Sequence, residues 1–370
     1  MNRVLKSPAR YVQGAGVLYQ FDQYLDGMGK RLLILISQSG TKRICPILDV
    51  CFAGKDYELH YDIFKGECSQ NQIDRLLEKA RELNCTAVVG IGGGKILDTA
   101  KGVAHHGNLP VVIVPTVAST DSPCSSLSVV YHDNGEFDKY LFLRNCPDMV
   151  LVDTDVIVKA PVDLLVAGMG DAMATWFEAR ACRASGSSNQ VGGKPTLAAT
   201  GMAKMCWELL QQCGPAAKEA VARHECTEDV ETIVEVNTYL SSVGFESGGL
   251  AAAHAIQKGF TFIPQLHALY HGYKVAFCTI TQLVMEESED LDAVLEFCCA
   301  VGLPVCFSDM GYTEIDYEKL RLAAEKTIAP TMTIHHLPFP VSAEMVYDAL
   351  LKADAIGSAY RARRSQSVSK

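Results

Sequence analysis

Short apolar runs alternate with amphipathic segments along the first 160 residues of the chain. Buried strands are predicted where aliphatic and β-branched residues follow one another, at residues 32–36, 86–91, 111–114 and 149–152. Apolar side chains at three- and four-residue spacing predict helices between them, at residues 70–83 and 96–104. Strands that alternate with helices indicate βαβ units and a mainly parallel sheet.

The pattern changes after Pro161, where helical periodicity dominates and strand signals become few. Helices are predicted at residues 170–184, 196–212, 227–242, 251–258, 273–286 and 343–360. We therefore expect an α/β domain over residues 1–160 and an all-helical domain over residues 161–370.

Composition and charge narrow the classes of function. The hydrophobic share of 48% and the charged share of 21% are typical of a folded globular protein. A formal net charge of −10 without any basic run argues against a nucleic-acid partner. No apolar run approaches the roughly 18 residues that span a bilayer, and the N-terminus lacks the apolar core of a signal peptide. The 14 cysteines show no paired CxxC spacing, so we expect a reducing, cytoplasmic location.

A glycine-rich turn joins the second predicted strand to the following helix. Gly92, Gly93 and Gly94 let the backbone approach a ligand closely, and Lys95 adds a positive charge. The free N–H groups of the helix N-terminus favour an anion. The turn matches neither the GxGxxG fingerprint nor the GK[ST] phosphate loop, and a tight turn without a ligand is the alternative. Three glycines followed by Lys are more than a turn requires, which favours phosphate binding.

A second segment, VVIVPTVASTDSPCSSLS at residues 111–128, follows the next buried strand with small hydroxyl residues and Asp121. Loops at the carboxyl ends of strands are where open α/β sheets bind ligands. The hydroxyl groups suit contacts with the phosphate, ribose or amide of a cofactor. A Ser- and Thr-rich surface loop is an equally good interpretation of this segment alone.

Metal-ligand chemistry is concentrated in the helical half. Asp171 is expected at the start of a helix, His254 lies among small apolar residues, and His267 and His271 are four residues apart, so that the two could share one helix face. One carboxylate with two or three imidazoles suits a divalent transition metal, and three protein ligands indicate a catalytic site. Each histidine taken singly is more often a hydrogen-bonded core residue, but the small-residue settings favour a ligand site.

Several long segments together resemble the glycerol dehydrogenase family of the iron-containing-type alcohol dehydrogenase superfamily. The matching segments are GIGGGKILDTAK, PTVASTDSPCSSLSVVY, GMGDAMATWFEAR, EVNTYLSSVGFESGGLAAAHAI and YHGYKVAFCTITQLV. They stand in the family's order, and the resemblance extends from about Arg10 to Tyr360. It implies a dehydroquinate synthase-like fold, with a Rossmann-like parallel-sheet domain, an all-helical domain and the site in the cleft between them.

The resemblance also implies a set of site residues. Zinc would be bound by Asp171, His254 and His271, with His267 outside the principal ligands. Iron-dependent relatives carry another His where this chain has Thr175. Asp121 and His254 would contact the substrate. The cofactor would be bound by Gly92, Gly93, Gly94, Lys95, Asp98, Thr116, Ser119, Ser125, Leu127 and Tyr131.

One departure from the family concerns the cofactor. The family often has an acidic residue after the first predicted strand, where it binds the adenosine ribose, and this chain has Ser37. An acidic side chain at that place favours NAD over NADP. We expect NAD, with NADP left open.

The resemblance implies oxidation of glycerol to dihydroxyacetone by a homo-oligomer, such as an octamer. Alternatives are another vicinal diol, a phosphorylated polyol such as glycerol 1-phosphate, and a non-catalytic cofactor-binding scaffold. A phosphorylated polyol, like the substrate of a dehydroquinate synthase, requires basic residues near the metal. Only Lys258 and Lys274 are candidates, and they form no cluster in the sequence.

Overall fold

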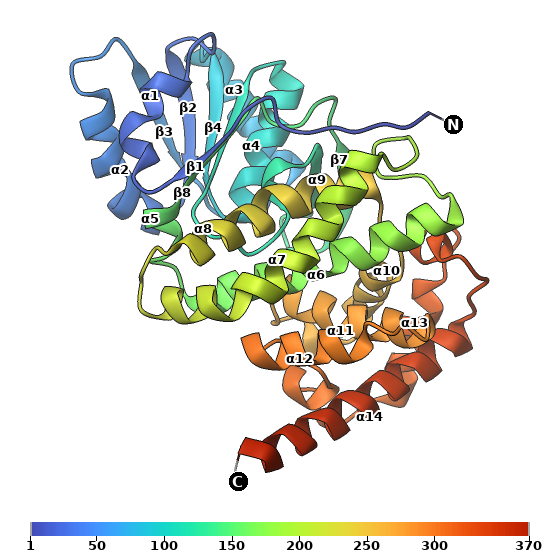
Figure 1. Ribbon diagram of the computed structural model, residues 1–370. Helices are drawn as coiled ribbons and strands as arrows, with labels where there is room; N and C mark the ends of the chain where they lie inside the picture. The colour runs from blue at the N-terminus through green and yellow to red at the C-terminus, as the bar shows by residue number, and fades with distance from the viewer. Residues whose placement is uncertain (1, 369–370) are drawn as a thin grey trace.

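A six-stranded sheet forms the N-terminal part of the protein (Figure 1). The computed structural model describes residues 2–368. Every neighbouring pair of strands is parallel, and the spatial order is β1-β8-β5-β4-β2-β3. The strands are β1 (Tyr11–Gly14), β2 (Arg31–Ile36), β3 (Glu58–Ile63), β4 (Ala87–Gly92), β5 (Val111–Pro115) and β8 (Met149–Asp153). The predicted α/β fold class is confirmed.

Helices cover both faces of this sheet. Ile34 and Ile36 of β2 pack on the face covered by α2 (Gln38–Phe52), whereas Leu33 and Leu35 belong to the apolar core with α3 (Gln70–Glu82) and α4 (Gly94–Gly107). The adjacent strands β2 and β4 therefore send their following helices to opposite faces. In open α/β sheets such a switch in direction creates a crevice at the carboxyl ends of the strands, where ligands bind.

A hairpin and short helices complete this part. The hairpin pairs β6 (Leu127–Tyr131) with β7 (Phe137–Phe142) in antiparallel register. The short elements are η1 (Val17–Gln20), α1 (Phe21–Tyr24), η2 (Ser122–Cys124) and α5 (Thr154–Ile157). The hairpin was not predicted from the sequence.

The remainder of the described chain is helical and lies below the sheet in Figure 1. Its longer helices are α6 (Val162–Ser185), α7 (Leu197–Ala222), α8 (Glu228–Glu235), α9 (Ser241–Gly248), α10 (Ala252–Gly259), α11 (His271–Met285), α12 (Leu291–Val301), α13 (Tyr317–Thr327) and α14 (Ala343–Val368). A π-helical turn, η3 (Val236–Leu240), joins α8 to α9, and the 3₁₀ turns are η4 (Phe260–Phe262), η5 (Pro264–Leu266), η6 (Phe307–Met310) and η7 (Thr333–His336). Among the helices of residues 2–368, none has the length and apolar character needed to cross a bilayer.

The structure corrects three details of the sequence prediction. Helix α6 begins at Val162 rather than at residue 170, so Asp171 lies in its interior. Helix α7 continues through Pro215 to Ala222 rather than ending at residue 212. His267 and His271 share no helix face, because His271 is the first residue of α11. The domain boundary at residue 160 stays a prediction, which the helix start after Pro161 supports.

All 14 cysteines lie within the described residues and are free thiols. Most are buried, and burial raises the pKa of several, including Cys68 to about 12. These side chains act as small apolar residues of the core.

Candidate active site

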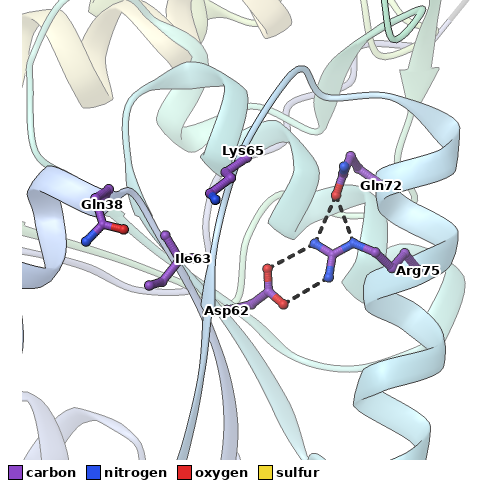
Figure 2. Close-up of a pocket in the computed structure, with 6 residues that line it drawn as sticks. All are labelled: Gln38, Asp62, Ile63, Lys65, Gln72 and Arg75. Carbon is purple, nitrogen blue, oxygen red and sulfur yellow. Dashed lines mark hydrogen bonds and ion pairs between the residues drawn. The ribbon is translucent and has the colours of Figure 1, made fainter.

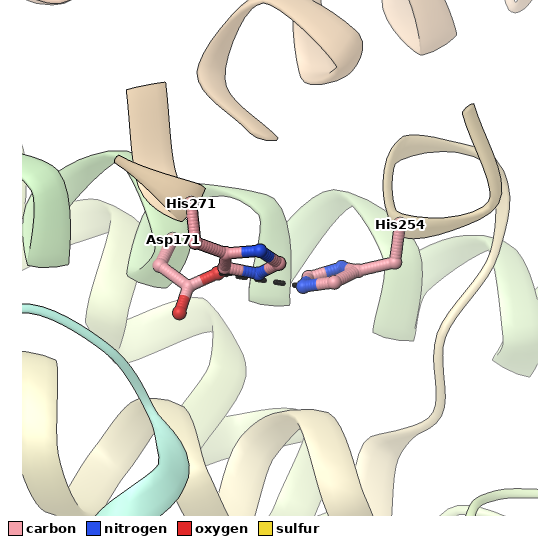
Figure 3. A group of neighbouring side chains, drawn as sticks. All are labelled: Asp171, His254 and His271. Carbon is pink, nitrogen blue, oxygen red and sulfur yellow. Dashed lines mark ion pairs between the residues drawn. The ribbon is translucent and has the colours of Figure 1, made fainter. Parts of the chain in front are cut away.

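Three side chains from three helices converge at one point of the helical part (Figure 3). The ligand atoms of Asp171 on α6, His254 on α10 and His271 on α11 all lie within 4.8 Å of one another. Oδ1 of Asp171 is 3.4 Å from Nε2 of His254 and 3.2 Å from Nε2 of His271. Asp171 is fully buried, whereas the side chain of His271 is 37% exposed and leaves the group open on one side.

This group fits a divalent cation. Oδ1 of Asp171 is buried and accepts no hydrogen bond from any described residue, although two imidazole nitrogens point toward it. Burial alone would raise the pKa of Asp171, but the imidazoles of His271 and His254 outweigh burial and lower it. An ionised carboxylate and two imidazoles are a donor set that transition metals prefer, with a position left for substrate.

Two glycines bring Asp171 and His271 together. A Cβ at Gly272 would lie 1.7 Å from the carbonyl oxygen of Ala167, and a Cβ at Gly170 would lie 2.4 Å from the carbonyl oxygen of Gly272. Helices α6 and α11 therefore cross with their backbones in contact. Asp171 follows one glycine and His271 precedes the other, so the crossing places the two side chains near each other. Sequence reasoning missed this role of the glycines.

Glu178 was also missed. It lies seven residues after Asp171 on α6 and is fully buried. Its Oε2 is 2.5 Å from Nδ1 of His254, and its Oε1 accepts hydrogen bonds from the backbone N–H groups of Ala251 (2.8 Å) and His254 (3.0 Å). Because a carboxylate only accepts, Nδ1 of His254 carries the hydrogen and Nε2 is left for a metal.

The electrostatics of His254 follow from these two carboxylates. Burial of the imidazole opposes its protonation, but Glu178 and Asp171 outweigh that effect and raise the pKa of His254 well above its ordinary value. The two carboxylates thus stabilise positive charge at this histidine, whether that charge is a proton or a bound cation.

Asp121 lies directly beside the cluster of Asp171, His254 and His271, which is called the metal-type group below. Its backbone N–H donates to Oδ2 of Asp171 at 3.1 Å, and its own side chain is buried. Oδ2 of Asp121 has no hydrogen-bond partner among the described residues. Burial and then the carboxylate of Asp171 raise the pKa of Asp121 well above its ordinary value. A buried, unpartnered carboxyl oxygen at this place is available to a substrate hydroxyl.

The loop that carries Asp121 is fixed to the helical part. Asn237, in the π-helical turn η3, donates to the carbonyl oxygens of Ala118 and Leu165, each at 3.0 Å. The hydroxyl of Ser242 donates to the carbonyl oxygen of Asp121. Gly168 makes the approach feasible, because a Cβ there would lie 2.1 Å from the oxygen of Ala118.

The glycine-rich turn joins β4 to α4 as predicted. Gly93 is the N-cap of α4 and supplies no side-chain cap, so the first N–H groups of the helix remain available. A Cβ at Gly94 would meet no atom within 4 Å, and one at Gly93 only Val117 at 3.8 Å. This open backbone suits a phosphate group. Gly92 packs inward instead, because a Cβ there would lie 2.6 Å from Ile96.

Lys95, which the sequence predicts as a phosphate-binding cation, is paired with an acidic side chain. Its side chain is 59% exposed, and its Nζ lies 2.5 Å from Oε1 of Glu67. The ion pair holds the lysine at the rim of the turn. A phosphate would share the ammonium with Glu67 or displace that carboxylate.

Asp98 is buried behind the Asp121-bearing loop that follows β5. It accepts hydrogen bonds from the backbone of Val129 (3.0 Å) and the hydroxyl of Ser122 (3.3 Å), and its Oδ1 is 3.1 Å from Nζ of Lys101. Lys101 is itself fully buried and donates to the carbonyl oxygens of Ser122 and Leu127, both at 2.8 Å. This pair organises the loop from below, and Lys101 was missed in the sequence.

The other residues expected at the cofactor lie along the same loop. Thr116 is buried and its N–H donates to the carbonyl oxygen of Gly92 at 3.0 Å, which connects the loop to the glycine-rich turn. Ser125 is buried, and Ser119, Leu127 and Tyr131 are half-buried. The bond of Asp121 to Asp171 continues the same loop to the metal-type group.

His267 is not part of the group. It follows η5, is exposed, and its Nε2 lies 2.8 Å from the carbonyl oxygen of Thr261. Ser37 caps α2, accepting from the N–H of Gly40 at 3.0 Å.

Comparison with known proteins gives a consistent result. The family model for iron-containing alcohol dehydrogenase matches residues 8–154. The chain is 47% identical to glycerol dehydrogenase of Escherichia coli O6:H1 over 362 residues, which is 97% of this chain and 99% of that protein.

Solved structures of glycerol dehydrogenases also superpose on this chain over nearly its full length. Glycerol dehydrogenase of Schizosaccharomyces pombe superposes with a TM-score of 0.94 at 34% identity, covering 98% of this chain and 93% of that one. A probable glycerol dehydrogenase of Sinorhizobium meliloti superposes with a TM-score of 0.90 at 37% identity, covering 96% of this chain and 99% of that one. With this sequence identity extending over both parts of the fold, the chain belongs to the iron-containing alcohol dehydrogenase family.

Proposed function

We propose that the protein oxidises glycerol to dihydroxyacetone, with transfer of a hydride to NAD and release of a proton. The observation that carries the proposal is the position of Asp121, one hydrogen bond from Asp171 and on the loop that leads to the glycine-rich turn. The metal-type group, the Asp121 carboxyl that would bind substrate and the glycine-rich turn that would bind phosphate are thus joined in one continuous site. The glycerol dehydrogenases at up to 47% identity support the substrate.

Each side chain has a distinct role in this proposal. Asp171, His254 and His271 would hold a divalent ion, which we take to be zinc, and the ion would supply Lewis-acid polarisation of a substrate hydroxyl. Glu178 keeps Nε2 of His254 directed at that position. Asp121 accepts a hydrogen bond from a second hydroxyl and so orients the substrate.

The cofactor would extend along the crevice. The N–H groups at Gly93 and Gly94 would bind its pyrophosphate. Thr116, Ser119, Ser125, Leu127 and Tyr131 would contact its nicotinamide half, while Asp98 and Lys101 hold that loop in place. A fixed loop supports hydride transfer by keeping ring and substrate in one orientation.

A phosphorylated polyol is less well supported. Nζ of Lys258 lies over the ring of Tyr140, 4.6 Å from its centroid. Burial lowers the pKa of Lys274 and thereby disfavours its charged form. The two lysines offer no paired anion site. Other vicinal diols present the same two hydroxyls as glycerol and belong in the same assay.

The first experiment is glycerol-dependent reduction of NAD before chelation, after chelation and after zinc is restored. Loss of activity on chelation and its return with zinc is the expected result. Zinc-loaded protein that reduces NAD with neither glycerol nor another vicinal diol would contradict the proposal.

A matched pair of histidine variants tests the ligand set. His271→Ala is expected to bind less than stoichiometric zinc, measured by elemental analysis, and to lose at least about a hundredfold in turnover, more than the roughly 10–100-fold typical of outer-sphere partners. His267→Ala removes a nearby exposed imidazole and should retain both. Equal zinc content in the two variants would remove His271 from the ligands.

We also propose that the chain assembles as a homo-oligomer, an octamer as the family resemblance suggests. Light scattering of the purified protein tests the assembly, and a monomer would contradict it.

A further inference from the structure

A cavity of about 370 Å³ opens at the carboxyl ends of β2 and β3 (Figure 2). It is lined by Gln38, Asp62, Ile63, Lys65, Gln72 and Arg75. Strand β2 pairs with β4 on its other side, with Ile36 opposite Ile91. Because neighbouring strands lie about 5 Å apart, the cavity is within reach of a nucleotide whose phosphates occupy the glycine-rich turn after β4.

The charge of the cavity is positive. Asp62 is its one acidic lining residue, and both of its oxygens are engaged. Oδ1 lies 3.0 Å from one nitrogen of Arg75, and Oδ2 lies 3.0 Å from another and 2.8 Å from Nζ of Lys79. Two cations thus neutralise one carboxylate with a positive charge left over.

Lys65 adds a further cation. Its side chain is exposed and makes no hydrogen bond or ion pair with any other residue in the described part of the chain. Figure 2 shows it between Gln38 and the Asp62–Arg75 pair. A lysine ammonium at such a place is available to an anion.

The end of β2 lacks the group that would reject an anion. An acidic side chain there accepts hydrogen bonds from the ribose 2′-hydroxyl and repels a 2′-phosphate. This chain has Ser37, whose hydroxyl oxygen accepts from Gly40 as the N-cap of α2. The first N–H groups of this 15-residue helix, at Gln38 and Ser39, face the same end and favour negative charge.

We propose that this cavity accepts the 2′-phosphate of an adenosine ribose, so that NADP serves as a cofactor in addition to NAD. Lys65 would bind the phosphate, and Arg75 would add to the field while it remains paired with Asp62. The inference rests on the nucleotide site of the proposed function, and it concerns only the adenosine end of that site.

Calorimetric titration of the purified protein with 5′-ADP and 2′,5′-ADP tests the inference without turnover. We expect 2′,5′-ADP to bind about tenfold more tightly, which corresponds to about 1.4 kcal/mol. The preference should shrink as salt is raised, because exposed charges are screened. Binding of 5′-ADP with equal or weaker binding of 2′,5′-ADP would overturn the inference and leave the proposed function intact. Binding of neither nucleotide would overturn the nucleotide site and the inference together.

Two pairs of variants localise the effect. Ser37→Asp and Ser37→Asn both preserve an N-cap acceptor, so α2 should remain capped. Only the Asp variant should lose the preference for 2′,5′-ADP, because only it adds a negative charge. Lys65→Ala should abolish the preference and leave 5′-ADP binding unchanged. Lys352→Ala should change neither, because Lys352 belongs to α14, a helix that lies far from β2 and β3 in Figure 1. An unchanged preference in Lys65→Ala would refute the assigned phosphate ligand.

Discussion

Replacement of Glu178 by Gln would test how the metal-type group is held together. The carboxylate accepts three hydrogen bonds, from Nδ1 of His254 at 2.5 Å and from the backbone N–H groups of Ala251 and His254 at 2.8 and 3.0 Å. A glutamine of the same shape has one acceptor oxygen and one donor NH₂. Whichever way the amide turns, its NH₂ faces a donor.

The magnitude follows from what the amide cannot do. If its oxygen stays on the backbone N–H groups, the NH₂ meets Nδ1–H of His254, and the ring must change tautomer or rotate. The change to the other tautomer places a hydrogen on Nε2, where the metal would bind. Loss of such an outer-sphere partner lowers metal affinity about 10–100-fold. The charged hydrogen bonds lost contribute about 1.5–3 kcal/mol each to the stability of the metal-free protein.

Competition with a chromophoric chelator would measure zinc affinity, and urea unfolding of the chelated protein would measure stability. Glu246→Gln is the matched control, because Glu246 is also buried and accepts from the N–H (2.8 Å) and hydroxyl (2.6 Å) of Ser126. It should lose stability and keep its zinc affinity. Zinc affinity of Glu178→Gln within twofold of the unmodified protein would refute the reasoning on the tautomer.

Two further substitutions, with Gly201→Ala as a control, have clear expected outcomes. Gly272→Ala places a Cβ 1.7 Å from the carbonyl oxygen of Ala167, so it should lower the free energy of unfolding in urea by about 3 kcal/mol or more and should also lose zinc binding. Gly201→Ala, in α7 with open space around its Cβ, should instead raise the free energy of unfolding by about 0.5–1 kcal/mol. Equal effects of the two variants would contradict the close helix crossing. Lys101→Met leaves Asp98 buried without its cation, so the free energy of unfolding should fall by about 3–5 kcal/mol in the same urea experiment. A fall of under about 1 kcal/mol would show that the pair is not buried in solution.

The central strands could be predicted from the sequence because burial on both faces makes each a continuous apolar run. The strand predicted at residues 111–114 is one such run, and its counterpart β5 is buried along its whole length. Strand β3 was missed because it is the edge strand next to β2, and its sequence ELHYDI mixes charged and apolar residues. Helix α2 was missed because Pro46 and Gly40 interrupt its pattern, yet Ser37 caps it and Ile44 and Leu48 bury one face.

The metal-type residues were proposed from their chemistry and from the family resemblance, whereas their supports were not. Aspartate and histidine are residue types that commonly bind divalent transition metals. Glu178 carries no such mark, because the sequence ATWFEAR also reads as an ordinary helix face. Its partner is the imidazole of His254, 76 residues away along the chain. Only the crossing of α6 and α10 shows that this carboxylate points inward.

The sequence was equally unable to predict the charge of the cavity that we propose for the adenosine ribose. The absence of an acidic residue at Ser37 is visible in the sequence and leaves the choice of cofactor open. The charge of the cavity depends on whether Asp62 is paired. An unpaired carboxylate there would repel a 2′-phosphate. Its pairing with Arg75, 13 residues further along, turns an acidic lining residue into part of a positive surface. In the proposed site, cofactor preference would therefore depend on which carboxylates remain unpaired at the ends of β2 and β3, and a count of acidic residues in the sequence cannot give that.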